Sequence, residues 1–139
     1  MNTKITNAHI ISLINVLNGF GDKKLPQRIS YAISKNLKNL NKEYEFYQGE
    51  LQKLLKNYSD FYEKDDDGNV KILPNGIPSV TPPHDTDFEN DLAELLSMET
   101  DVKLYKIDSD SFDYDDEKYD VLSPTEITNL MVILCEDDE

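Results

Sequence analysis

With 139 residues and 38% hydrophobic side chains, the chain is long enough for one domain with a modest core and too short for two full ones. Its net charge of −14 opposes direct binding to nucleic acid or to an anionic membrane. The lone cysteine, Cys135, excludes a disulfide framework and a Cys-based zinc site. No signal peptide or membrane-spanning run is recognisable, so we expect a cytoplasmic protein.

Two helices are predicted in the N-terminal half. Thr6 or Asn7 suits the capping position of a first helix over residues 6–18, whose apolar residues recur every three or four positions. Pro26 suits the first turn of a second helix, which is predicted to run to Phe61. This long helix has a complete heptad pattern of apolar a and d positions: Ile33, Leu37, Leu40, Tyr44, Tyr47, Leu51, Leu54, Tyr58 and Phe61.

The heptad stripe has two interpretations. One is packing against other helices of the same chain, and the other is formation of a homo-oligomer through residues 33–61. Tyrosine at three of the nine positions is unusual for a dimeric coiled coil, which favours the first interpretation or an adaptable partner surface.

The middle of the chain changes character. Residues 63–84 contain a turn signature at 65–69 and four prolines, so they are predicted to form a mobile turn and loop. A calcium loop is disfavoured, because the position that needs a bidentate Glu is Pro74. A helix is predicted from Asp85 or Thr86 to Met98, followed by a strand over residues 102–107 whose expected partner is the run at 70–73.

The C-terminal part is the most acidic. Residues 108–139 contain one Lys against twelve Asp and Glu, whereas residues 1–62 contain nine Lys and Arg against five. An acidic loop is predicted over residues 108–122. The capping box of Ser123 and Glu126, with Pro124 at the first helical position, predicts a last helix to Cys135 before an acidic tail.

These elements predict a mainly α fold, an antiparallel helical bundle around one long heptad helix, with a small two-stranded β patch and an acidic loop. We expect a single domain over residues 1–139. Its parts are a helical hairpin at 6–62, a loop at 63–84, a helix and strand at 85–107, the acidic loop at 108–122 and the last helix and tail at 123–139.

Residue patterns typical of catalysis are absent from the sequence. No glycine-rich phosphate loop, nucleophile motif or zinc spacing occurs, and neither His9 nor His84 accompanies a nucleophile. We therefore expect a protein that is not an enzyme and has no catalytic residues, cofactor or metal.

The acidic loop is the candidate partner-binding surface. Its carboxylates predict attraction to a protein with a basic surface, and its aromatic rings would serve as anchors. The candidate contact residues are Asp108, Asp110, Phe112, Asp113, Tyr114, Asp115, Asp116, Glu117, Tyr119 and Asp120. The alternative is that the loop only solubilises the chain. The lysines and arginine between Lys23 and Lys42 could contact nucleic acid directly. Because the net charge opposes this, they are expected to be solvated or to pair with the acidic half.

Residues 24–37, with the sequence KLPQRISYAISKNL, and the later LSPTEI element at 122–127 resemble a family of small phage and prophage proteins of unknown function. The resemblance implies expression in the cytoplasm of a bacterial host. With the acidity, it favours an inhibitor that mimics nucleic acid and binds a host nucleic-acid-binding or defence enzyme, such as a nuclease. The alternative is an accessory protein of phage assembly or replication that binds through the heptad helix.

Overall fold

The computed structural model describes residues 2–136, in which helices predominate and one two-stranded antiparallel sheet is present. The chain divides into two compact units. The core unit comprises the described parts of Met1–Tyr44 and Glu99–Glu139, and the hairpin unit comprises Glu45–Met98. The long helix α2 (Gln27–Asn57) contributes residues to both units.

The first and last helices of the core unit begin where their capping residues predict. The Thr6 Oγ1 accepts a 3.1 Å hydrogen bond from the His9 N–H and caps α1 (Asn7–Asn18). Helix α4 (Pro124–Leu134) has the predicted capping box, in which Ser123 and Glu126 each bond the other's backbone N–H. Both helix starts are therefore confirmed.

Helix α2 (Gln27–Asn57) ends four residues before the predicted end, and a short 3₁₀ helix, Ser59–Phe61, follows it. All nine positions of the apolar stripe are buried or half-buried, and Ile33, Leu40 and Tyr47 are the most enclosed. In the core unit the stripe faces the chain's own apolar residues, because Ile33 and Leu40 belong to the core, and Leu37 and Tyr44 pack against it.

The sheet pairs β1 (Asn2–Thr6) with β2 (Glu99–Lys103), so the predicted pairing with residues 70–73 is wrong. The register places Thr3 opposite Val102 and Ile5 opposite Thr100. Because opposed residues share a face, Ile5 and Val102 are both buried, while Lys4 and Asp101 are exposed on the other face. The predicted strand at 102–107 also lies too late in the chain, since β2 ends at Lys103.

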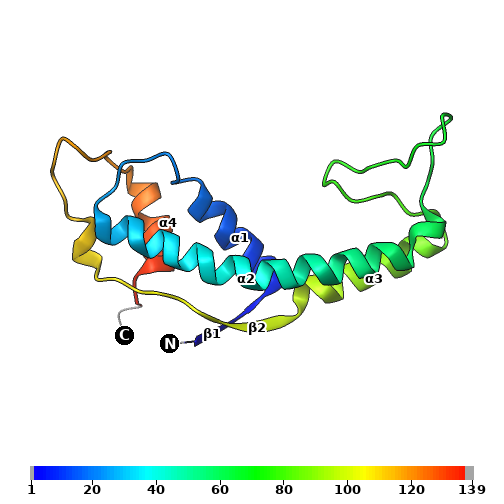
Figure 1. Cartoon of the computed structure of the whole chain (residues 1–139), viewed down its shortest axis with the longest axis horizontal. Helices are drawn as coiled ribbons and strands as arrows, with labels where there is room; N and C mark the ends of the chain where they lie inside the picture. The colour runs from blue at the N-terminus through cyan, green and yellow to red at the C-terminus, as the bar shows by residue number, and fades with distance from the viewer. Residues whose placement is uncertain (1, 137–139) are drawn as a thin grey trace. The chain divides into compact units, whose positions relative to one another are not determined.

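The hydrophobic core of this unit lies between α1, α4, the first part of α2 and the sheet (Figure 1). Its fully enclosed side chains come from all three helices: Leu17, Ile29, Leu40, Leu130 and Leu134. Cys135 is also buried there, as expected for a structural thiol.

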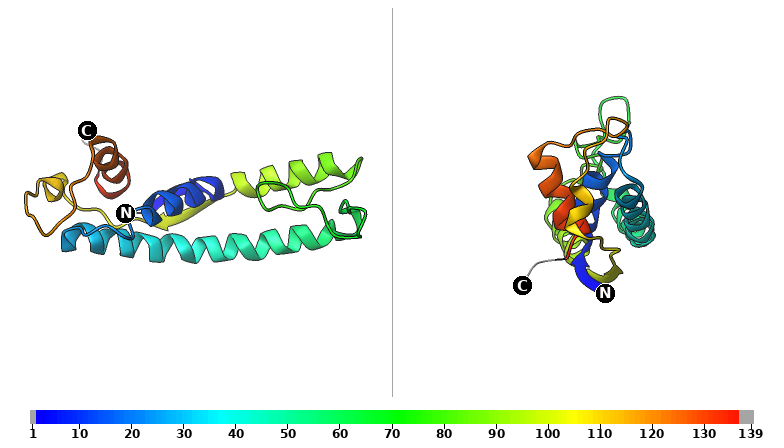
Figure 2. Two further views of the ribbon diagram at one scale, coloured as in Figure 1. Left: turned by 90° about the horizontal axis from the view of Figure 1, so that it is seen from above. Right: turned by 90° about the vertical axis from the view of Figure 1, so that its left-hand side faces the viewer.

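In the hairpin unit, α3 (His84–Ser97) runs back along the second part of α2 (Figure 2). The Tyr58 ring meets buried Phe88 edge-on at 5.2 Å, and its hydroxyl donates a 2.6 Å hydrogen bond to Asp91. The acceptance of this bond by Asp91 is the main cause that raises the pKa of Tyr58 to about 12. Tyr58 therefore ties the end of α2 to α3.

The connection between these helices is hydrogen-bonded to itself. An isolated antiparallel β-bridge joins the backbones of Lys64 and Val70 across the predicted turn. Within this turn, the Asp65 carboxylate accepts hydrogen bonds from the N–H groups of Asp67 and Asn69. The run at 70–73 thus forms one arm of a hairpin, as its turn signature predicts, and Ile72 bridges Pro78 in the same segment. These local bridges replace the pairing expected with the strand at 102–107.

Candidate partner-binding surface

The acidic segment between β2 and α4 is anchored in the core at both ends. Phe112 closes a short 3₁₀ helix, Ser109–Phe112, and is only 8% exposed, and Leu122 at the other end is 6% exposed. Phe112, a candidate partner anchor, packs into the core cluster, so its ring offers little exposed surface to a partner. Only residues 113–121 between these two points are mainly solvent-facing.

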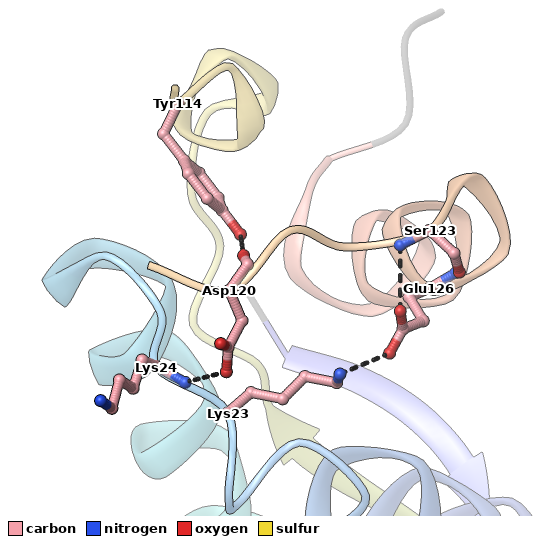
Figure 3. A network of polar contacts seen from close by, with 6 residues as sticks. All are labelled: Lys23, Lys24, Tyr114, Asp120, Ser123 and Glu126. Carbon is pink, nitrogen blue, oxygen red and sulfur yellow. Dashed lines mark hydrogen bonds and ion pairs between the residues drawn. The ribbon is translucent and has the colours of Figure 1, made fainter. Parts of the chain in front are cut away.

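Asp120 fastens the segment to the connection between α1 and α2 (Figure 3). Its N–H donates to the Lys24 carbonyl at 2.7 Å, and its carboxylate accepts the Lys24 N–H at 2.7 Å. Its own carbonyl accepts the Tyr114 hydroxyl at 2.6 Å, which closes the turn of residues 114–120. The Asp120 carboxylate, predicted as a partner contact, is therefore engaged inside the chain.

A second contact lies beside this one. The Lys23 ammonium is 3.2 Å from the Glu126 carboxylate, whose other oxygen accepts the Ser123 N–H at 2.9 Å (Figure 3). The bond from Ser123 and, after it, the one from Lys23 hold the pKa of Glu126 below its usual range. Lys23 thus pairs with the acidic half, as expected for part of the basic face, whereas Lys24 contacts Asp120 through its backbone.

All seven candidate carboxylates of the segment are exposed. Apart from Asp120, which accepts the Lys24 N–H, they are Asp108, Asp110, Asp113, Asp115, Asp116 and Glu117. Of these, Asp116 is 3.5 Å from the ammonium of Lys118, itself an exposed residue. Such an exposed pair is weak, so it leaves the negative charge of the segment available.

The two predicted tyrosine anchors form walls of a pocket of about 440 Å³. Tyr114 and Tyr119 are half-buried and meet edge-on, with ring centroids 5.7 Å apart. Burial and then the charges of Asp120 and Glu126 raise the pKa of Tyr114. Val121, which sequence reasoning missed, also lines the pocket and is 88% exposed.

Lys118 shows what chemistry the pocket rim favours. Its ammonium lies 5.3 Å from the centroid of the Tyr119 ring, with the Asp116 carboxylate at its side. A cation placed between an aromatic face and a carboxylate is attracted by both. In the chain itself, the Lys118 ammonium takes this position.

Metal binding and catalysis would each require a particular arrangement of side chains in the described part of the chain. Within residues 2–136, no three His, Cys, Asp or Glu side chains are arranged to hold a metal ion. His84 stacks on Phe61 at 3.7 Å in the hairpin unit, while His9 is exposed on α1 in the core unit. No helix of the described part is both long and apolar enough to cross a membrane. The end of the acidic tail, 137–139, lies outside the described residues.

Comparison of the chain with protein-family models, with curated proteins and with solved structures finds no match.

Proposed function

We propose that this chain is a phage-encoded, non-enzymatic inhibitor that binds the basic nucleic-acid site of a host enzyme, such as a defence nuclease, in the bacterial cytoplasm. The observation that carries the proposal is the anchored acidic segment. Four of the exposed carboxylates lie on a stretch that is fixed by Phe112, Leu122 and Asp120 and that includes a tyrosine-lined pocket, and exposed Asp108 and Asp110 precede it.

Electrostatics supports such a partner. A protein of net charge −14 is steered towards a positively charged cleft, and the carboxylates of residues 108–117 would occupy the places of phosphates there. Anchoring matters as well, because a segment already held by the core loses less conformational entropy when it binds. The complex should weaken as salt is raised.

Specificity would come from the pocket. Tyr114, Tyr119 and Val121 line the pocket beside its acidic residues, together with the largely buried Phe112, and they are the more exposed anchor residues of the proposal. Rim charges set mainly the association rate, whereas buried contacts set mainly the dissociation rate. The two classes of residue should therefore be separable by kinetics.

The phage origin rests on the resemblance of residues 24–37 and 122–127 to the phage family. Affinity capture from a bacterial lysate, with the purified chain as bait, tests the kind of partner. A retained nuclease or other nucleic-acid-binding enzyme supports inhibition. A retained capsid, tail or replication protein contradicts it.

With the partner identified, charge-neutralised variants test the surface. The test variant changes four exposed carboxylates of the segment to amides: Asp113, Asp115, Asp116 and Glu117. The control makes the same charge change in the hairpin unit, at Asp66, Asp67, Glu89 and Glu94. The test variant should associate more slowly, with a deficit that shrinks as salt is raised, and the control should behave much more like the wild type. Equal loss in both would mean that total charge, and not this surface, drives binding.

Tyr114→Ala should instead speed dissociation. Since this change also removes the hydrogen bond to Asp120, Tyr114→Phe separates the two contributions. If the ring is the anchor, the Phe variant keeps most of the affinity. If both variants leave the dissociation rate unchanged, the pocket has no part in binding.

The second candidate is an accessory protein of phage assembly or replication that binds through α2. The observation in its favour is Phe46, which is 70% exposed on α2. A large exposed aromatic ring is a common anchor of protein interfaces. If Phe46→Ser abolishes capture of the partner while neutralisation of the acidic segment does not, this second function is the correct one.

We further infer an antiparallel bundle in which α2 is the central helix. In the core unit, this is supported by the burial of Ile33 and Leu40 against α1 and α4. In the hairpin unit, it is supported by the contact of Tyr58 with Phe88 of α3. Intramolecular packing of the stripe leaves less of it for a homo-oligomer.

A further inference from the structure

A basic, aromatic groove lies in the core unit between α2 and the chain that follows β2. Its volume is about 610 Å³, and its lining includes Lys35, Lys103 and Lys106 together with the rings of Tyr31 and Tyr105. The two rings meet edge-on with centroids 5.3 Å apart, and they are 49% and 39% exposed. Their exposed parts and the lysines thus share one hollow.

Two asparagines of α2 hold the groove together. Asn36 is fully buried, donates from its amide to the Tyr105 carbonyl at 2.9 Å and accepts the Tyr105 N–H at 2.6 Å. Asn39 donates to the Lys103 carbonyl at 2.8 Å. The backbone that carries Lys103 and Tyr105 is therefore fixed against α2, beside Tyr31 and Lys35, before any ligand arrives.

Two of the three groove lysines have no ion-pair partner among the described residues. Within residues 2–136, neither Lys35 nor Lys103 forms an ion pair, although the chain has 28 carboxylate side chains. Lys106 donates to the Ile133 carbonyl at 2.8 Å, which keeps its charge at the rim. Glu136 is the carboxylate among the lining residues.

The positive charge continues along α2 beyond the groove. Exposed side chains recur at three- and four-residue steps, which places them along one side of the helix: Arg28, Tyr31, Lys35, Lys38 and Lys42. None of the four cations has an ion-pair partner among the described residues. The groove is therefore the aromatic part of a longer basic stripe.

We propose that this groove binds a short single strand of nucleic acid, with a base stacked on Tyr31, the more exposed of the two rings, and the neighbouring phosphates on Lys35 and Lys103. Exposed aromatic rings flanked by cations bind single strands in this way without strong sequence preference. An acidic peptide would use the lysines but would gain little from the two rings. The site is separate from the proposed function and does not depend on it.

The net charge of −14 predicts no direct binding of nucleic acid. A total charge, however, does not describe how the charges are distributed over the core unit. The cations of the stripe lie together on α2 and the chain after β2, and the exposed acids of residues 108–117 lie on another segment of the same unit. Those acids should weaken oligonucleotide binding, and at about 0.1 M salt their repulsion is screened beyond about 10 Å.

Fluorescence anisotropy with a labelled oligothymidine of ten nucleotides tests the proposal on the full chain. Wild type should bind at low ionic strength, and Tyr31→Ala should weaken binding by between about 5-fold and about 150-fold, the range for loss of one stacked base. Tyr31→Phe should keep the affinity. Phe46→Ala, which removes an exposed ring outside the groove, is the matched control and should change nothing.

The lysines are tested by salt dependence. The double variant Lys35→Gln with Lys103→Gln should flatten the plot of log affinity against log salt by about 1.4, because each phosphate contact of a single strand contributes about 0.7. The control with the same charge change is Lys56→Gln with Lys64→Gln, both exposed in the hairpin unit. Circular dichroism verifies that each variant is folded.

Three results would overturn the proposal. They are absence of wild-type binding at low salt, equal affinity of Tyr31→Ala and wild type, and equal competition by polyglutamate of matched charge. The variant with neutral residues at Asp113, Asp115, Asp116 and Glu117 adds a distinguishing test. It should bind the oligonucleotide more tightly than wild type while binding the proposed partner more weakly. Failure at either site therefore leaves the other measurable.

Discussion

Replacement of Asn36 is the most informative single change in the core unit. This side chain is the buried polar residue among the described ones, and its amide satisfies both the carbonyl and the N–H of Tyr105. These two hydrogen bonds hold the chain after β2 against α2. We expect Asn36→Leu, which has a similar size and no polar atoms, to destabilise the protein substantially.

The magnitude follows from what is lost. Two hydrogen bonds contribute about 0.5–1.5 kcal/mol each to net stability. The partly buried N–H and carbonyl of Tyr105 would also lose their partner, and an unsatisfied buried group costs about 1–3 kcal/mol. The apolar leucine recovers part of this through burial, so the free energy of unfolding should fall by about 2–4 kcal/mol.

Asn39→Leu is the matched control, because Asn39 makes one bond to the neighbouring Lys103 carbonyl from a half-buried position. Its cost should stay near about 1 kcal/mol. Urea unfolding followed by circular dichroism measures both variants. If Asn36→Leu costs no more than Asn39→Leu, Asn36 does not hold Tyr105, and the construction of the groove is wrong.

Three further changes test the packing and the polar contacts. Leu40→Asp buries an unpaired charge and should unfold the core unit, whereas Leu51→Asp, at a half-buried position, should lower the free energy of unfolding less. If circular dichroism and hydrodynamic size stay unchanged in both variants, the packing assigned to the apolar stripe of α2 is wrong. The raised pKa of Tyr58 favours the neutral ring in the folded state, so its stabilisation should be lost as the pH rises from 10.0 towards about 12; tyrosinate absorbance should show a late titration that Tyr58→Phe removes. The lowered pKa of Glu126 gives stability the opposite dependence on pH. The stabilisation by the ionised carboxylate is present above pH 4.5 and is lost as the pH falls through the lower pKa of the folded state. Urea midpoints of wild type and Glu126→Gln should therefore differ at neutral pH and converge in acid, and a constant difference would contradict the Lys23 and Ser123 contacts.

The sequence alone determined the features that depend on neighbours within one or two helical turns. The caps at Thr6 and Ser123 were predictable because each hydroxyl bonds an N–H three residues ahead. The apolar stripe of α2 from Ile33 to Leu54 was predictable because its spacing matches the turn of a helix, whereas Tyr58 and Phe61 lie beyond the helix end at Asn57. The exposure of the acidic stretch followed from the cost of burying charge.

Only the tertiary structure decided which distant segments meet. β2 pairs with residues 2–6 instead of 70–73. A short strand carries little information about its partner or register in its own sequence, so packing against the core decides the pairing. Phe112 is a core residue and Asp120 is held by Lys24, 96 positions away, and neither fact is readable from composition. The basic groove likewise exists only because Asn36 brings Tyr105 to α2, a contact across 69 positions that packing selects and local propensity does not encode.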